Sequence, residues 1–306
     1  EAWLQRSDCD VLAIQETKAR EDQFPMDRLT ALGYEVAHQG LNQWNGVAIL
    51  SRVGLTDVEV GFPGMPSFGD PMVSEARALG ATCGGVRVWS LYIPNGRALG
   101  DPHLAYKLDW LERLRQAAGD WLTTNPSAPI ALVGDGNSAP QDEDVWDMAV
   151  VAASTHVSPP ERAAFQAIVD AGYSDVARAY TPGPGVYTYW DYTQLSFPKR
   201  HGMRIDFVLG SPGFSSRVVG ASIDRDERKG TGARGQATVI AKPLDAWGTH
   251  QLTRPRPRAR AATVSVRNAG SGPAEAVGAT TRPGETLASS EPSGIEARKS
   301  RSTRRS

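Results

Sequence analysis

The chain has 306 residues, 40% of them hydrophobic and 22% charged, and its formal net charge is −1. This composition allows a sizeable buried core. No stretch approaches the roughly 18 consecutive apolar residues of a membrane-spanning helix, so we expect no membrane partner. The two cysteines, Cys9 and Cys83, exclude a disulfide framework. No signal peptide is visible at the N-terminus, which begins with Glu1 rather than Met, and we interpret the chain as a fragment of a cytoplasmic protein.

Apolar runs along the first 230 residues predict buried strands. The runs are Val11–Ile14, Val47–Leu50 and Ile130–Val133, followed by an alternating stretch from Val86 to Ile93 and a strand over Ile205–Leu209. Several of these strands follow one another without room for a helical crossover. We therefore predict an α/β fold with mixed sheets rather than a purely parallel sheet.

Two longer helices are predicted between the strands. One begins at Asp101-Pro102, a capping residue followed by a proline that suits the first helical turn, and its apolar residues recur at helical spacing as far as Trp121. The other covers residues 161–171 and ends at Gly172, a natural C-terminal stop.

Charge and composition divide the chain near residue 230. Residues 231–306 hold 13 Lys and Arg against 5 Asp and Glu, and they are rich in Arg, Pro, Ser, Ala and Gly. Their apolar residues show neither strand nor helix periodicity. We therefore predict a folded domain at 1–233 and a basic, disordered tail at 234–306. Such a tail either binds nucleic acid through phosphates or is a solvated segment without a function of its own.

Carboxylates and amides occur where the apolar strands end. Glu16 follows the first strand, Asp135 and Asn137 follow the run that ends at Val133, and Asp206 lies inside a strand. An aspartate within an apolar strand is costly unless it is paired, hydrogen-bonded or near a metal. Oxygen ligands of this kind suit Mg²⁺ or Mn²⁺, whereas zinc spacing, phosphate loops and serine-hydrolase motifs are absent. Taken singly, a carboxylate at the end of a strand is more often a cap or a surface side chain, and Asp135-Gly136 could be an ordinary turn.

The motifs along residues 8–230 occur in an order that resembles the exonuclease III family of DNA-repair enzymes, within the endonuclease/exonuclease/phosphatase superfamily. The stretches that carry the resemblance are Gln15–Lys18, Asn45–Ile49, Tyr92–Gly96, Gly134–Pro140, Tyr187–Tyr192 and Arg204–Asp206. The resemblance implies a four-layer sandwich of two mixed β-sheets flanked by helices. It also implies a monomer that uses Mg²⁺, or Mn²⁺, as a 3′-to-5′ exodeoxyribonuclease and abasic-site endonuclease on double-stranded DNA, at abasic sites and 3′ ends.

The resemblance also assigns roles to matching residues. It makes Glu16 the metal-binding carboxylate, Asp135 the residue that orients or deprotonates the attacking water, and Asn137 the amide that holds the scissile phosphate. It gives Tyr92 a contact with that phosphate and makes Asp206 the carboxylate that orients a catalytic histidine. The residues expected to contact DNA are Asn95, Arg97, Tyr189, Trp190 and Arg204, of which Tyr189 and Trp190 border the pocket for the baseless sugar.

Three departures from the family lead us to expect impaired catalysis. The chain begins after the family's first strand, and Gly136 stands where the family's Gly-Asp-Trp-Asn motif has Trp. The family closes with Ser-Asp-His-Ala-Pro and an apolar strand, whereas this sequence turns to Arg234-Gly235-Gln236. We interpret that change as a reading-frame shift that removes the Asp and His and the closing strand, which leaves unpaired sheet edges. The alternative function is a catalytically inactive remnant that binds nucleic acid weakly or non-specifically.

Overall fold

The computed structural model describes residues 2–7, 9–191, 195–225, 237–243 and 264–268. These residues belong to one compact unit, Glu1–Gly272, while the second unit, Pro273–Ser306, lies outside the described residues. In the described ranges, no helix combines the length and the apolar character needed to cross a bilayer.

The first sheet has the strand order β12-β13-β14-β1-β3-β2. Its strands are β1 (Val11–Gln15), β2 (Glu35–Gln39), β3 (Val47–Ser51), β12 (Val218–Asp224), β13 (Thr238–Pro243) and β14 (Val264–Asn268). Strand β1 pairs parallel with β14 and antiparallel with β3, so the sheet is mixed as predicted.

The second sheet has the strand order β4-β5-β6-β7-β11-β8. Its strands are β4 (Thr56–Val60), β5 (Ala78–Cys83), β6 (Val86–Tyr92), β7 (Ile130–Asp135), β8 (Ser174–Asp175) and β11 (Asp206–Gly210). Strand β7 pairs parallel with β6 and antiparallel with β11, which makes this sheet mixed as well. A separate short ladder joins β9 (Tyr189–Trp190) to β10 (Gly202–Met203).

The longest helix begins where the sequence supplies a cap. In the longest helix, α3, the Asp101 side chain accepts a 2.7 Å bond from the His103 amide, and Pro102 occupies the first turn. The helix that we predicted to end at Gly172 is α5. The helices are α1 (Ala2–Ser7), α2 (Met26–Ala31), α3 (Pro102–Thr124), α4 (Met148–Val151), α5 (Pro159–Asp170), α6 (Ser196–Lys199) and α7 (Pro212–Ser215), with 3₁₀ turns at Glu21–Gln23 and Asp142–Asp144.

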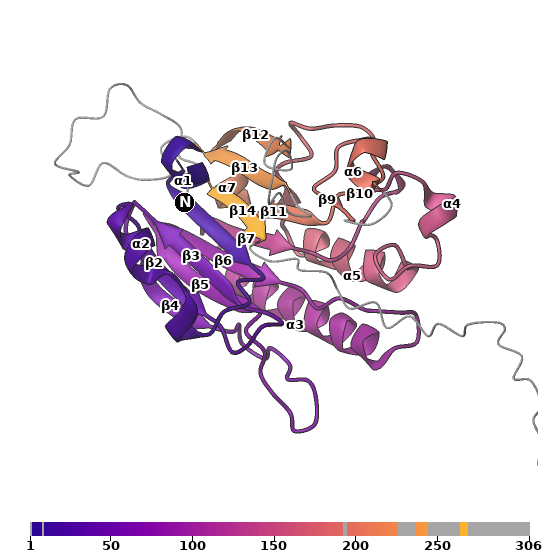
Figure 1. The fold of residues 1–306 in the computed structure, drawn as a ribbon, viewed down its shortest axis with the longest axis horizontal. Helices are drawn as coiled ribbons and strands as arrows, with labels where there is room; N and C mark the ends of the chain where they lie inside the picture. The colour runs from indigo at the N-terminus through magenta and orange to yellow at the C-terminus, as the bar shows by residue number, and fades with distance from the viewer. Residues whose placement is uncertain (1, 8, 192–194, 226–236, 244–263, 269–306) are drawn as a thin grey trace, which may run out of the picture. The chain divides into compact units, whose positions relative to one another are not determined.

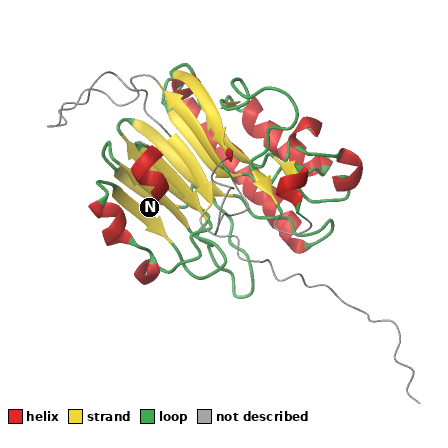
Figure 2. Cartoon of the chain, turned by 45° about the horizontal axis from the view of Figure 1, so that its top comes forward, coloured by secondary structure: helices red, strands yellow, loops and turns green. Residues whose placement is uncertain are grey.

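The two sheets pack face to face and helices cover their outer faces (Figures 1 and 2). Between the sheets, Val11 and Ile49 from the first pack with Val88 and Val208 from the second. Strands buried on both faces read as continuous apolar runs, which is why β1, β3 and β7 were visible in the sequence.

Further apolar clusters lie outside the sheet pair. Trp110 of α3 and Phe165 of α5 pack on Leu132 of the second sheet. Trp3 of α1 and Leu29 of α2 pack in the cluster that includes strands of the first sheet. The four-layer arrangement of helix, sheet, sheet and helix is therefore confirmed.

Part of the segment that we expected to be disordered forms sheet. Strand β13 pairs antiparallel with β12, from Asp224 opposite Thr238 to Val218 opposite Pro243. Strand β14 lies between β13 and β1. The expectation that a closing strand is missing is therefore wrong. The rest of 234–306, including the position of the supposed frame shift, lies outside the described residues.

The strand at 238–243 has a physical basis that the sequence did contain. Val239 and Ala241 are fully buried in the core between the sheets, while Lys242 is exposed, so the segment follows the period of a half-buried strand. A proline at the end of a strand is tolerated, because it need not donate to the ladder.

Gly134 in β7 provides a test of this packing. Its φ is +149°, and an added Cβ would lie 1.8 Å from the Leu91 carbonyl oxygen. We expect Gly134→Ala to lower the free energy of unfolding by about 3 kcal/mol or more, measured by urea unfolding. The matched control is Gly119→Ala in α3, where a Cβ meets nothing within 4 Å and should raise it by about 0.5–1 kcal/mol. Equal stability of the two variants would contradict the close approach of β6 and β7.

Candidate active site

The carboxyl end of β7 brings three predicted site residues into a row. Tyr92 at the end of β6 is the cross-strand partner of Asp135, and Asp135 is the cross-strand partner of Asp206 at the start of β11. The side chains are nearly buried, at 9%, 3% and 2% exposure respectively. The register of one sheet therefore places a phenol and two carboxylates side by side.

Glu16 joins this row from the other sheet. The Tyr92 phenol donates a 2.6 Å hydrogen bond to Oε1 of Glu16, which follows β1. Lys18 Nζ lies 3.4 Å from the other carboxylate oxygen. One hydrogen bond between side chains thus links the ends of the two sheets at the site.

Glu16 lies in a turn that the Asn45-Gly46 motif supports. Its backbone is left-handed, with a φ of 52°, a conformation that a non-glycine residue keeps only when its surroundings enforce it. The amides of Thr17 and Lys18 donate to the carbonyls of Gly46 and Asn45 at 3.2 and 2.9 Å. The Asn45-Gly46 motif therefore acts by holding the metal-binding candidate in place.

Asn137 is held in a second left-handed turn, with a φ of 44°. Its amide nitrogen donates to Asp135 Oδ1 at 2.8 Å. Its side-chain Nδ2 donates to the Ile93 carbonyl at 2.9 Å, and its Oδ1 accepts from Asn95 Nδ2 at 3.1 Å. The structure therefore brings Asn95 into the site beside Asn137.

Burial and like charge dominate the electrostatics of the row. Burial raises the pKa of Asp206 well above its usual range, and the nearby carboxylates of Asp135 and Glu16 raise it further. Its Oδ2 is buried without a hydrogen-bond partner in the described part of the chain. Burial and the charge of Glu16 likewise raise the pKa of the Tyr92 phenol, so Tyr92 is a neutral hydrogen-bond donor at pH 7.

Two residues expected to contact DNA are buried instead. The Arg204 guanidinium is 2% exposed and bonds Asp144 at 2.7 Å and Asp175 at 2.5 Å. Trp190 is fully buried and packs edge-on against Phe197. The prediction that both contact DNA is therefore wrong, because their side chains are part of the interior that supports β9 and β10.

The remaining candidates lie nearer the surface. Arg97 is exposed and has a left-handed backbone, with a φ of 60°. Tyr189 is half-buried and lines a pocket of about 310 Å³ together with Trp146, Asp191 and His201. The Trp146 and His201 rings stack with centroids 3.7 Å apart. Tyr192, from the same motif, lies outside the described residues.

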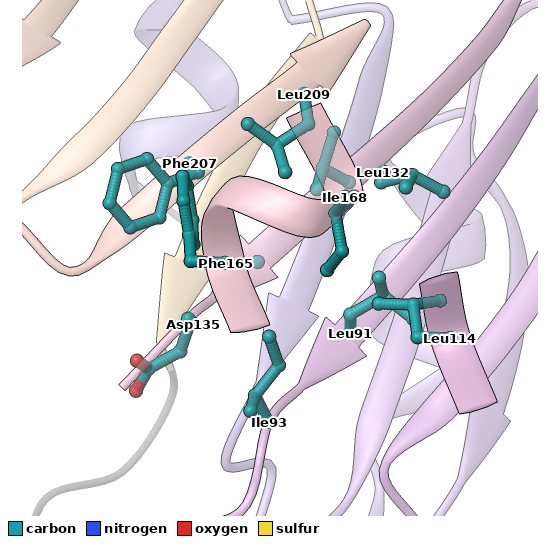
Figure 3. A pocket seen from close by; sticks show the side chains of 12 residues that line it. Leu91, Ile93, Leu114, Leu132, Asp135, Phe165, Ile168, Phe207 and Leu209 are labelled. Carbon is teal, nitrogen blue, oxygen red and sulfur yellow. The ribbon is translucent and has the colours of Figure 1, made fainter. Parts of the chain in front are cut away.

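Main-chain contacts stabilise the loop after β7, in which residue 136 is glycine. The Gly136 amide donates to the Ile205 carbonyl at 2.6 Å, and an added Cβ would meet that oxygen and the Phe207 ring, both at 3.0 Å. Beneath the loop is an apolar cavity of about 20 Å³, and Figure 3 shows the Asp135 carboxylate directed away from its lining. The loop is therefore fixed by main-chain bonds rather than by an aromatic side chain.

Sequence reasoning missed Lys107. Its ammonium group is fully buried on α3 and donates to the Asn137 carbonyl at 2.5 Å. A signal was present, because Lys107 lies three residues after Leu104 and four before Leu111, on the apolar face of the helix.

Comparison with known proteins identifies the family of the chain. Residues 1–271 match the endonuclease/exonuclease/phosphatase family. The chain belongs to that family. It is 28% identical to an exodeoxyribonuclease of Bacillus subtilis, over 74% of this chain and 86% of the relative. It is also 28% identical to exodeoxyribonuclease III of Haemophilus influenzae, over 74% and 87%.

Solved structures give the same result. A 3′-5′ exonuclease from Neisseria meningitidis superposes with a TM-score of 0.74 and 33% identity, over 79% of this chain and 92% of that one. An AP endonuclease from Archaeoglobus fulgidus gives a TM-score of 0.73 and 29% identity, over 79% and 91%. The resemblance to exonuclease III inferred from the motifs is confirmed.

The raised pKa of Asp206 leads to a prediction about pH. A carboxyl group whose pKa is higher in the folded than in the unfolded chain destabilises the fold as the pH rises above the unfolded value of about 4. We expect Asp206→Asn to remove this loss. In buffer without divalent cations, its free energy of unfolding should exceed that of the parent by more at pH 8 than at pH 4.5, by at least about 1.4 kcal/mol.

The control is Asp120→Asn, on the exposed side of α3, which should leave the pH dependence of the parent intact. Parallel stability curves for the parent and Asp206→Asn between pH 4.5 and 8 would show that the Asp206 carboxyl is not strained by its neighbours.

Proposed function

We propose that this chain is a DNA phosphodiesterase of the repair type, acting as a 3′-to-5′ exodeoxyribonuclease and abasic-site endonuclease that depends on Mg²⁺ or Mn²⁺. The observation that carries the proposal is the 2.6 Å bond between Tyr92 and Glu16, which unites the two halves of the site beside Asp135. A 3′ phosphatase from Neisseria with 33% identity, described as bound to a product DNA hairpin, supports DNA as the partner. A cytoplasmic location and a monomeric state remain part of the proposal.

The residues present fit a hard divalent cation. Asp206 Oδ2 is a buried oxygen without a partner in the described residues, and Glu16 and Asp135 are close enough to raise the pKa of Asp206. Among the described residues, no group of three or more His, Cys, Asp or Glu side chains has the arrangement of a metal cage. That accords with Mg²⁺, which commonly takes one or two carboxylates and keeps several waters. Glu16, with its partly accessible carboxylate, would hold it.

The remaining steps fall to residues of the chain. Asp135, fixed by the Asn137 amide, is placed to orient the attacking water and to take up its proton. The side-chain Nδ2 of Asn137 has a second N–H beyond the one given to the Ile93 carbonyl, and this N–H is a donor for the phosphate oxygens, where negative charge develops. The neutral Tyr92 phenol is a second donor once it releases Glu16. When bound, the cation would neutralise part of that charge.

We further propose that cleavage is slow because Asp206 lacks an imidazole partner. No histidine of the described residues bonds to Asp206, whose side-chain hydrogen bond is with Thr188. By resemblance, a histidine should precede the Ala that leads into the closing strand. With β13 present, Gln236 holds that place in the sequence, directly before Ala237, and Gly235 holds the place of the aspartate.

The test is cleavage of a duplex with a synthetic abasic site, and of a duplex with a recessed 3′ end, in Mg²⁺. We expect the parent to cut slowly and EDTA to stop it. The double variant Gly235→Asp/Gln236→His should cut about 10²-fold faster, because a positioned general acid or base contributes about that factor.

The control is Asp135→Asn, introduced into the parent and into the double variant. It should lower cleavage about 10²- to 10³-fold without weakening DNA binding, measured by fluorescence anisotropy in Ca²⁺. Cleavage that continues undiminished in Asp135→Asn, or that proceeds in EDTA, would refute the proposed function.

A further inference from the structure

A buried ion pair lies directly behind the Asp135–Asn137 loop. The side chains of Lys107 on α3 and Glu161 on α5 are both 0% exposed and bond each other. Lys107 Nζ also donates to the Asn137 carbonyl oxygen, at 2.5 Å. A cation inside the protein is thus aimed at the main chain of one catalytic candidate.

The pair is itself fixed by the start of α5. Ser158, which precedes that helix, donates its hydroxyl to the second oxygen of Glu161 at 2.5 Å. The next residue of α5 is Arg162, whose Nε donates to the Ala139 carbonyl at 3.0 Å. Helices α3 and α5 therefore hold the loop at two carbonyl groups, those of residues 137 and 139.

Besides its own main-chain bonds, the Asp135–Asn137 loop depends on contacts from neighbouring elements to keep its conformation. Asn137 keeps a left-handed backbone, which costs about 1–3 kcal/mol for a residue other than glycine. Gly136 supplies no side chain to anchor it, and a cavity lies beneath. The carbonyl and the side chain of Asn137 share one Cα, so a shift of the main chain at the carbonyl also displaces the side-chain amide that would meet the phosphate.

We propose that Lys107 is a positioning residue of the active site, which acts through Asn137: the ammonium group, oriented by Glu161, fixes the Asn137 carbonyl and thereby the direction of its side-chain amide. The inference rests on the proposed function as far as Asn137 takes part in cleavage. The geometric part, that Lys107 orders the loop, is independent of it.

A contribution to the stability of the fold does not by itself explain the buried Lys107–Glu161 ion pair. Apolar residues of similar volume commonly replace a buried ion pair without loss of stability, because removing two charges from water is costly. Burial lowers the pKa of Lys107, while Glu161 and Asp135 raise it. A directed cation near Asp135 and Asn137 therefore accords with a role in ordering the site.

The first test is a double-mutant cycle. Lys107→Met alone would leave the Glu161 carboxylate buried and unpaired, so the variant is Lys107→Met/Glu161→Gln, which keeps the volume and the Ser158 bond and removes both charges. We expect kcat to fall about 10- to 100-fold at temperatures where the chain is fully folded, with KM changed less than twofold. In an Asn137→Ala background the same change should have no further effect, whereas an effect that is additive would overturn the proposal.

The second test needs no cleavage. Amide hydrogen exchange of the peptide covering residues 134–140 should be at least tenfold faster in Lys107→Met/Glu161→Gln than in the parent, while peptides from β2 and β3 exchange as before. Unchanged exchange in 134–140 would overturn the positioning role even if the nuclease proposal holds. Faster exchange in a chain that cleaves no DNA would support Lys107 and refute the proposed function separately.

The matched control is Arg52→Met. Arg52 also directs a side-chain nitrogen at a carbonyl, that of Leu32 at 3.2 Å, but at the opposite end of β3 from Gly46. It should lower the stability without altering kcat or the exchange of 134–140. An equal loss of kcat in Arg52→Met would mean that the effect of the Lys107 variant is a general consequence of destabilisation, and would overturn the proposal.

Discussion

Asp135 and Asp206 face each other across β7 and β11, nearly buried, with the Glu16 carboxylate close by. Like charges in such surroundings cannot all be ionised unless a positive charge compensates them. The site therefore has two ways to be stable. Either it keeps a proton on Asp206, or it binds a cation among its oxygen atoms. With the proposed function, that constraint links the folding of the chain to its chemistry, because a cation that relieved the repulsion would also neutralise charge on the phosphate.

The scaffold meets this constraint by combining two sheets at one edge. Strands β6, β7 and β11 set the spacing of Tyr92, Asp135 and Asp206 through their register, and the turn after β1 adds Glu16 from the facing sheet. At the ends of β1 and β7 the chain turns through left-handed residues, which are held by Gly46 and Asn45 on one side and by helices α3 and α5 on the other. Strands thus hold Tyr92, Asp135 and Asp206, whereas Glu16 and Asn137 lie in turns that neighbouring elements fix.

The sequence predicted the part of this site that depends on short local patterns. Continuous apolar runs located β1, β3 and β7, and the polar residues that follow them are those that meet in the structure. Partners far apart in sequence could not be read in the same way. From the sequence, Arg204 is a basic residue expected to contact DNA. Only the fold shows that it pairs with Asp144 and Asp175. Strand β13 was missed because its short alternation lies in a segment whose composition predicts disorder. Lys107 was missed because a lysine on an apolar helix face needs a buried partner to be recognised.

The central claim is that the ends of β1, β6, β7 and β11 form one cation site. It is tested most directly by soaking crystals of the full chain in Mn²⁺ and calculating an anomalous difference map. The account predicts one dominant peak in contact with the Glu16 carboxylate and beside Asp135 and Asp206. A dominant peak elsewhere, or a crystal structure in which these three carboxylates lie on separate faces, would contradict it.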